Sequence, residues 1–371
     1  MKQRDSEEDL KVVETYWPEI DESFLKLVGD KYSSLGAPVS INWHSQRPLS
    51  SAAIATFEGG EFFVKRHSKR VRTKEQLVYE HQFCEFLADC SVPAVTSIQS
   101  SEGETASLIQ GWTVEVQPIA PGDDLYRGRH TWQKALQPNH LESIGAHLGD
   151  LHHASLQYKA SDLRSVPFQS GEIPTISNPD LLSALQSRKL ASKVLTEFLS
   201  EDDLETIAAL YRSWHSQWIE VFNEIPKCVT HGDPCANNFM WQGDEVASII
   251  DFHLCGLTTP ALDLAIGIDR TCFHWLDILD GDPEAVSTDD ARLLLQGYQD
   301  QRPLNEQEQA AAKALLGLHR LEFALSLMEY FLTFEQSKPK AEWCRDVYIH
   351  LHAEYLHSEV GARKVGAIFA S

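Results

Sequence analysis

The feature that most constrains this chain is a polar segment set between apolar runs. Residues 230–238 read Thr-His-Gly-Asp-Pro-Cys-Ala-Asn-Asn, and Ile250-Asp251-Phe252 follows. The apolar residues around them predict a loop, a strand, a turn and a second strand, which would hold Asp233, Asn238 and Asp251 rigidly at one place. Phosphoryl transfer from ATP needs one residue that orients the attacking hydroxyl and two ligands for Mg²⁺. These three side chains can fill those three places.

Length and composition indicate a soluble enzyme. The 371 residues predict two domains or one large bilobal unit, and an apolar fraction of 43% is ample for sizeable cores. No apolar run is long enough for a membrane span, and the charged N-terminus is unlike a signal peptide. Seven scattered cysteines without a CxxC pair favour a reducing cytoplasm. The net charge of −22 argues against nucleic-acid binding, which needs basic surface to meet phosphates.

The predicted elements divide the chain into a sheet-rich part and a helical part. They are an acidic helix over about 5–27, a hairpin of strands 54–57 and 61–65, a helix over 73–89, strands over 107–109 and 112–116, and helices over 141–157, 178–199, 202–223 and from 289 to the end. We therefore expect an α+β fold with two lobes. The small N-lobe would comprise residues 1–117, and the larger, mainly helical C-lobe residues 118–371.

A lysine and a glutamate of the predicted N-lobe are candidates for a nucleotide site. Lys65 closes the second hairpin strand, where its ammonium can reach phosphates if a carboxylate on the next helix, Glu80, pairs with it. Lys65 also lies in a basic run, so it can instead be one more solvated cation. Residues 45–52 stand where a phosphate-covering loop is expected. They include no glycine, so a cradle there would use backbone N–H groups and the hydroxyls of Ser50 and Ser51.

The order of these motifs resembles that of the aminoglycoside phosphotransferase family, which has the protein-kinase-like fold and includes type II homoserine kinases and choline kinases. The resemblance is carried by His231-Gly232-Asp233 with Asn238, by Ile250-Asp251-Phe252, by Pro260-Ala261-Leu262-Asp263-Leu264-Ala265, and by Lys65, Glu80, Gly145, Leu148, Leu151 and His152. It covers roughly residues 30 to 340. A lone His-Gly-Asp would mean little, whereas three motifs in order are specific.

The resemblance implies roles for the residues of the polar segment. Asp233 would be the catalytic base or would orient the acceptor hydroxyl, while Asn238 and Asp251 would bind Mg²⁺. His231 is expected to make structural hydrogen bonds. Asp263 is expected to stabilise the catalytic loop from the next helix, because a buried carboxylate must find donors.

The resemblance also implies an ATP site. Lys65 would contact the phosphates, with Glu80 positioning its ammonium, and main-chain groups near Glu115 and Gln117 would bind adenine. ATP and Mg²⁺ are thus the expected cofactors. The reaction would be transfer of the γ-phosphoryl group to a hydroxyl of a small molecule.

The acceptor is expected above the catalytic aspartate, next to residues 263–275. Asp269 and Trp275 there can receive a cationic amine by charge pairing and a cation–π contact, or can be an exposed carboxylate and a core tryptophan. The family distributes one layout over amino acids, amino sugars, choline and antibiotics, so the fold alone does not choose among them. A small amino alcohol or amino sugar is the predicted acceptor.

Two other functions stay open. A serine/threonine protein kinase of the same superfamily would need an acceptor groove and an activation segment, and the interval from Asp251 to Asp263 is short. A pseudokinase scaffold would bind nucleotide without turnover, against which the intact Asp233, Asn238 and Asp251 argue.

Overall fold

The computed structural model describes residues 16–45, 47, 49–159 and 173–370. The described chain forms two compact units. The first contains residues 16–122 and the short segment Ser248–His253, and the second contains residues 123–159, 173–247 and 254–370. Asp251 therefore belongs to the first unit, and Asp233 and Asn238 belong to the second.

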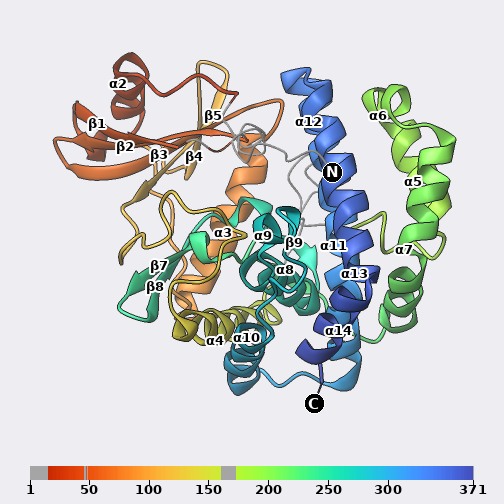
Figure 1. Ribbon diagram of the computed structural model, residues 1–371. Coiled ribbons are helices and arrows are strands. Elements are labelled where there is room, and N and C mark those ends of the chain that lie inside the picture. The colour runs from red at the N-terminus through yellow and green to blue at the C-terminus, as the bar shows by residue number, and fades with distance from the viewer. Residues whose placement is uncertain (1–15, 46, 48, 160–172, 371) are drawn as a thin grey trace. The chain divides into compact units, whose positions relative to one another are not determined.

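The first unit is built on a five-stranded antiparallel sheet with strand order β1-β2-β3-β5-β4 (Figure 1). Its elements are α2 (Glu22–Lys31), β1 (Pro38–His44), β2 (Ser51–Phe57), β3 (Gly60–Ser68), α3 (Lys74–Asp89), β4 (Ala106–Ile109) and β5 (Trp112–Pro118). Gly60, with φ +132°, opens β3 after the turn, in a backbone region that favours glycine. The predicted hairpin, helix and strands of this region are confirmed.

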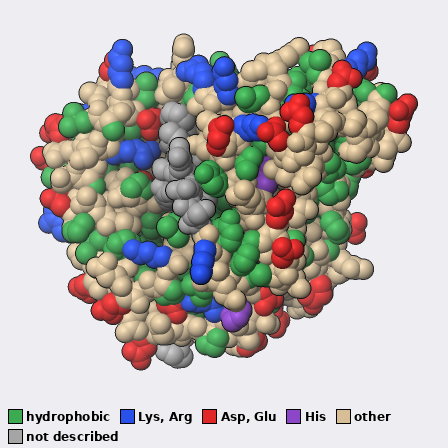
Figure 2. All heavy atoms as spheres, turned by 180° about the vertical axis from the view of Figure 1, so that it is seen from behind, with side chains coloured by type: hydrophobic (Ala, Val, Ile, Leu, Met, Phe, Trp, Pro, Cys, Tyr) green, Lys and Arg blue, Asp and Glu red, His purple; other side chains and the backbone are tan. Residues whose placement is uncertain are grey.

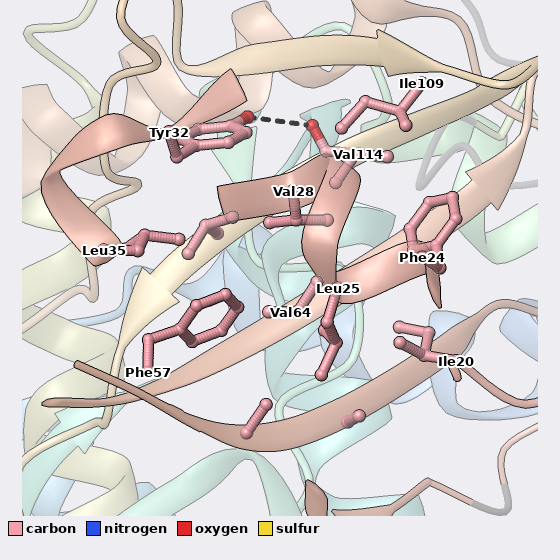
Figure 3. Packing of buried hydrophobic residues seen from close by; sticks show 13 residues of the cluster. Ile20, Phe24, Leu25, Val28, Tyr32, Leu35, Phe57, Val64, Ile109 and Val114 are labelled. Carbon is pink, nitrogen blue, oxygen red and sulfur yellow. Dashed lines mark hydrogen bonds between the residues drawn. The ribbon is translucent and has the colours of Figure 1, made fainter. Parts of the chain in front are cut away.

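One face of this sheet is apolar and packs against α2 (Figure 3). Phe24, Leu25 and Val28 of the helix meet Val64 of β3 and Val114 of β5, all of them buried. Because side chains alternate along a strand, the neighbours of these β3 and β5 residues point to the opposite face. That alternation directs the polar residues of β3 and β5 toward the other side of the sheet.

The predicted N-terminal helix over residues 5–27 differs from the structure. Residues 5–15 lie outside the described part of the chain, residues 16–21 are not helical, and α2 starts at Glu22. Pro18 precedes the start, and the Asp21 carboxylate accepts a hydrogen bond from the Phe24 N–H at 2.8 Å as the N-cap. The cap sets the helix start at Glu22, and at its other end α2 continues past Leu27 to Lys31.

The second unit is mainly helical. Its helices are α4 (Pro138–Ser155), α5 (Leu181–Ala191), α6 (Lys193–Phe198), α7 (Glu201–Val221), α8 (Pro260–Cys272), α9 (Trp275–Leu279), α10 (Thr288–Gln301), α11 (Glu306–Tyr330), α12 (Lys338–Trp343), α13 (His352–His357) and α14 (Glu359–Ile368), with π-helical η5 (Phe331–Glu335) and η6 (Cys344–Leu351). The single helix predicted over 178–199 is in fact two. Ser192 leaves the helical conformation and caps α6 through its hydroxyl.

Short strands of the second unit carry the polar segment. β6 (Cys228–Thr230) pairs with β9 (Gly256–Thr258), and β7 (Phe239–Gln242) pairs with β8 (Glu245–Ile249), whose last two residues belong to the first unit. The loop, strand, turn and strand predicted for residues 230–250 are thus confirmed.

Helices α4 and α10 approach each other backbone to backbone. A Cβ on Gly145 of α4 would collide with the main chain of Leu294, and one on Gly297 of α10 would collide with that of Glu142. Both helices contribute side chains to the polar network beneath Asp233, so this approach helps to position the site.

Membrane spans, disulfides and the distribution of surface charge can be judged over the described residues. Within the described ranges, the structure contains no helix with the length and apolarity of a membrane span. None of the seven cysteines, all of which are described, forms a disulfide. Figure 2 shows acidic side chains spread among lysines, arginines and apolar residues on the face in view, so the net charge is not gathered in one patch there.

Candidate active site

The backbone just before Asp233 is held from below by one carboxylate. Asp263, which is fully buried, accepts hydrogen bonds from the N–H groups of His231 at 2.7 Å and Gly232 at 2.9 Å. Gly232 has φ +85°, and a Cβ there would collide with the Leu254 carbonyl, so the tight turn requires glycine. A buried carboxylate with two main-chain donors fixes this turn in one conformation.

A chain of buried polar groups extends from Asp263 into the helices. His152 Nε2 of α4 lies 3.1 Å from the Asp263 carboxylate, and its Nδ1 lies 2.9 Å from the Tyr298 hydroxyl of α10. Arg302 donates to that hydroxyl at 3.1 Å and pairs with Glu308 of α11 at 2.5 Å. Burial raises the pKa of Tyr298, so its hydroxyl stays protonated. The turn before Asp233 is therefore tied to four helices, α8, α4, α10 and α11.

Asp233 itself is fixed through its main chain while its carboxylate stays partly exposed. Its N–H donates to His231 Nδ1 at 3.2 Å, and its carbonyl accepts from Cys235 N and from Asn238 Nδ2, both at 2.8 Å. The Asp233 side chain is 20% exposed. Asn238 thus uses its amide nitrogen to hold the loop. Its Oδ1 makes no hydrogen bond to the described residues, so it is an oxygen that a cation can use.

Arg270 of α8 lies beside the Asp233 carboxylate and is not among the predicted site residues. Its Nε is 3.4 Å from Asp233 Oδ1, and its guanidinium carbon lies 5.1 Å from the centre of the Phe323 ring. Burial lowers the pKa of Arg270, but nearby groups, first among them the Asp233 carboxylate, together raise it above its usual value. Arg270 follows Asp269 directly in the segment expected to line the acceptor, and that position is the only signal that sequence offers.

The predicted cation site at Asp269 and Trp275 is wrong, because the protein fills it with its own cation. Both side chains are buried, and the Trp275 indole donates to Asp269 Oδ1 at 2.9 Å. Arg320 of α11 pairs with both Asp269 oxygens, and its guanidinium carbon lies 5.4 Å from the centre of the Trp275 ring. The charge pairing and the cation–π contact expected for an acceptor amine are thus both made to Arg320. These contacts of Arg320 stabilise the packing of α11 with α8 and α9.

In the first unit, Lys65 pairs with Asp251. Lys65 Nζ lies 2.6 Å from Asp251 Oδ1, and His253 Nδ1 lies 2.5 Å from the same oxygen. Burial raises the pKa of Asp251, but His253 and Lys65 together lower it by more, so that it lies well below its usual value. Burial lowers and Asp251 raises the pKa of Lys65, which ends above its usual value. Asp251 Oδ2 makes no hydrogen bond within the described chain, so it can serve as a ligand oxygen.

The predicted Lys65–Glu80 pair is wrong in this structure. The Glu80 carboxylate binds the Arg72 guanidinium, and Arg72 also donates to the His253 carbonyl at 2.5 Å. Glu80 is therefore linked to the segment that carries Asp251, and its charge acts on Lys65 only at longer range. Lys65 pairs with the nearer carboxylate, which lies 186 residues further on and which spacing along the chain does not reveal.

The structure shows the surroundings of Glu115, whose main chain is predicted to contact adenine. Its main chain lies inside the sheet, between Lys65 of β3 and Ala106 of β4, and not at an edge. Its carboxylate lies 3.3 Å from His67 Nε2 and 3.1 Å from His81 Nε2. Adenine contacts by its main chain are therefore disfavoured.

The remaining nucleotide candidates stay predictions. Gln117 pairs with Phe63 of β3, beyond the end of the β4 pairing, so its main chain is less enclosed than that of the preceding residues. Ser50 and Ser51 are buried, and Ser51 opens β2 opposite Arg66. Residues 46 and 48 of the predicted phosphate-covering segment lie outside the described residues.

The fold and this order of polar residues define the class of protein, a phosphotransferase with a kinase-like fold. The sequence model of the phosphotransferase enzyme family (APH) matches residues 50–284, so the chain belongs to that family. The predicted family, fold class and enzyme class are thereby confirmed.

Similar proteins agree with this assignment. The chain is 22% identical over 292 residues to a homoserine kinase of Granulibacter bethesdensis, covering 79% of this chain and 81% of that one. It is 26% identical over 289 residues to a homoserine kinase of Rhodopseudomonas palustris, covering 76% and 77%. Among solved structures, it is similar to an amicoumacin kinase in complex with AMP-PNP and Ca²⁺ (TM-score 0.65, 15% identity, 94% and 96% covered). It is also similar to a microcompartment-associated aminopropanol kinase (TM-score 0.62, 14% identity, 93% and 100% covered).

Proposed function

We propose that this protein is an ATP- and Mg²⁺-dependent kinase that transfers the γ-phosphoryl group to a hydroxyl of a small molecule. The observation that carries the proposal is the construction of the Asp233 loop. Asp263 holds the turn before Asp233, and Asn238 holds the carbonyl of Asp233 itself. A partly exposed carboxylate on so rigid a support can accept a hydrogen bond from the attacking hydroxyl and orient it.

Asn238 and Asp251 are the proposed ligands of Mg²⁺. Mg²⁺ prefers oxygen ligands and is commonly held by one or two protein groups together with substrate phosphates. Asn238 Oδ1 and Asp251 Oδ2 are oxygens with no hydrogen bond to the described residues, so the donor set fits. When bound, the metal would neutralise phosphate charge. Lys65 would bind the phosphates through an ammonium that stays charged, because its pKa is raised.

The acceptor is proposed to be a small amino alcohol or hydroxy amino acid. Two facts support this range: relatives that align with three quarters of the chain or more are named homoserine kinases, and structures of the same fold are named aminopropanol kinase and amicoumacin kinase. A cationic acceptor bound at Asp269 is not part of the proposal, because Arg320 takes that place. The proposal includes a cytoplasmic location, where ATP is abundant.

The proposal is tested by ADP release with a panel of acceptors. Homoserine, choline, 3-aminopropan-1-ol, an aminoglycoside and casein are each supplied with ATP and Mg²⁺. We expect one of the small molecules, and not casein, to stimulate turnover. Casein stimulation would favour a protein kinase, and nucleotide binding without any stimulated turnover would favour a pseudokinase.

Asp233→Asn removes the orienting carboxylate and keeps its shape. We expect kcat to fall by about 10²- to 10⁴-fold, because general-base catalysis contributes this much in comparable steps. Asp289→Asn, at a side chain that is 89% exposed, is the matched control and should leave kcat unchanged. Equal turnover by Asp233→Asn and the wild type would refute the role of Asp233.

A further inference from the structure

Arg270 is a largely buried cation whose donors are not used. Its side chain is 12% exposed, yet within the described chain its guanidinium makes no hydrogen bond, and its Nε is fully enclosed without a partner. Asp233 Oδ1, which lies 3.4 Å from Arg270 Nε, is also buried and has no hydrogen-bond partner. Buried guanidinium groups are normally bonded, because five N–H donors are costly to remove from water. An unbonded arginine beside a catalytic carboxylate indicates that a ligand supplies the acceptor atoms.

The other charged groups around Arg270 are already balanced. On α11, Arg320 is paired with Asp269 of α8. His319 of α11 and His352 of α13 are buried, and desolvation lowers the pKa of each, so both rings are neutral. The Phe323 ring of α11 and the Tyr348 side chain of η6 carry no charge.

Among the described residues, the carboxylate that pairs with Arg270 is therefore that of Asp233, at 3.4 Å and without a hydrogen bond. A guanidinium offers a planar fork of donors that fits a carboxylate with two parallel hydrogen bonds. An acceptor carboxylate on this fork would leave Asp233 available for a hydroxyl of the same molecule.

We propose that Arg270 binds a carboxylate of the acceptor and so selects small hydroxy acids over amino alcohols that lack the carboxylate. The inference rests on the proposed kinase function and names the substrate class of that site. The sequence predicts that the segment after Asp263 binds a cationic group of the acceptor through Asp269. The proposed contact is instead with an anionic group of the acceptor, because Asp269 is paired with Arg320 and Arg270 is the charged side chain next to Asp233. Arg270 is then a specificity-determining residue.

The test compares two acceptors that differ only in the carboxylate, homoserine and 3-aminopropan-1-ol. For the wild type we expect kcat/KM to favour homoserine by about 100-fold, since hydrogen bonds between charged groups contribute differences of this order. In Arg270→Gln the preference should fall to a few-fold, mostly through a higher KM for homoserine. Arg270→Lys, which keeps the charge without the fork, should lie between the two. Arg212→Gln, at an exposed position of α7, is the control and should keep the wild-type preference.

A different pattern would overturn the inference. If Arg270 only orients Asp233, Arg270→Gln will lower kcat for both acceptors by the same factor and leave the preference unchanged. A wild type that prefers 3-aminopropan-1-ol, or that treats the two alike, contradicts the inference and leaves the kinase function standing. A wild type that phosphorylates neither acceptor, nor any other of the panel, contradicts the kinase function itself.

Binding without ATP gives a second readout that needs no turnover. Titration calorimetry of the wild type should detect homoserine and not 3-aminopropan-1-ol at the same concentration. Arg270→Gln should lose homoserine binding, whereas Asp233→Asn should retain it, because the carboxylate contact is intact. Homoserine binding that is unchanged in Arg270→Gln, or no binding of homoserine to the wild type, would overturn the inference.

Discussion

Lys65 and His253 both contact the same oxygen of Asp251, which is therefore ionised and partly neutralised before any metal arrives. Asp251→Asn removes that charge at nearly constant volume. We expect the Mg²⁺ concentration for half-maximal activity to rise at least about tenfold and kcat to fall, since Mg²⁺ binds carboxylates far better than amides. Asp89→Asn, exposed at the end of α3, is the control. An unchanged Mg²⁺ requirement in Asp251→Asn would move the metal site elsewhere.

At the scale of single residues, candidate site residues can be named from the sequence, whereas the partners of their side chains cannot. Asp233, Asn238 and Asp251 stand out because few other roles explain that spacing. Proximity along the chain suggests the wrong partners for Glu80 and Asp269, since Arg72 and Arg320 bind them instead. A buried carboxylate pairs with whichever cation the fold brings closest, and that depends on packing between distant segments.

At the scale of elements, the approach of α4 and α10 offers a test of how the loop is supported. Gly145→Val would place side-chain atoms against the main chain of Leu294. We expect the helices to separate, the free energy of unfolding to fall by about 1–3 kcal/mol or more, and kcat to fall as His152 shifts from Asp263. Urea unfolding and ADP release measure the two effects.

A glycine substitution at an open helical position shows the effect of replacing a helical glycine without a collision. Gly366 of α14 has open space where a Cβ would lie, with no atom outside its own turn of helix within 4 Å, so Gly366→Ala should be neutral or stabilise by up to about 1 kcal/mol. If Gly145→Val were as stable and active as the wild type, the close contact of α4 and α10 would not support the site.

Element types were largely predictable, and several boundaries were not. The hairpin of β2 and β3 follows from two apolar runs around a glycine pair, which is a strong local signal. The start of α2 and the break between α5 and α6 depend on single capping side chains, Asp21 and Ser192, whose hydrogen bonds exist only in the folded chain. The periodicity of apolar residues does not reveal such capping residues.

At the scale of the whole molecule, buried histidines predict how stability depends on pH. Desolvation lowers the pKa of His67 to about 3 from its ordinary 6.5, and it also lowers the pKa values of His319 and His352. Below pH 6.5 the unfolded chain therefore binds more protons than the folded one. The free energy of unfolding should fall from pH 7 to pH 5, with each histidine contributing up to about 1.4 kcal/mol per pH unit.

Urea unfolding at a series of pH values measures this slope. His352→Phe keeps an aromatic ring in the stack on Trp275 and removes one titrating group, so its slope should be smaller. His153→Gln, at an exposed position of α4, should keep the wild-type slope. A free energy of unfolding that is constant or rises between pH 7 and pH 5 would contradict the neutral state of these histidines.

The proposed role of Asp233 is to direct the γ-phosphoryl group of ATP onto a hydroxyl of a small acceptor. Its most direct test is the mass of the product formed from γ-¹⁸O-labelled ATP and homoserine, under Mg²⁺, by the wild type and by Asp233→Asn. We predict an O-phosphorylated acceptor that carries the label with the wild type, and at least about 100-fold less of it with the variant. Labelled inorganic phosphate without phosphorylated acceptor, or equal product from both proteins, would contradict the account.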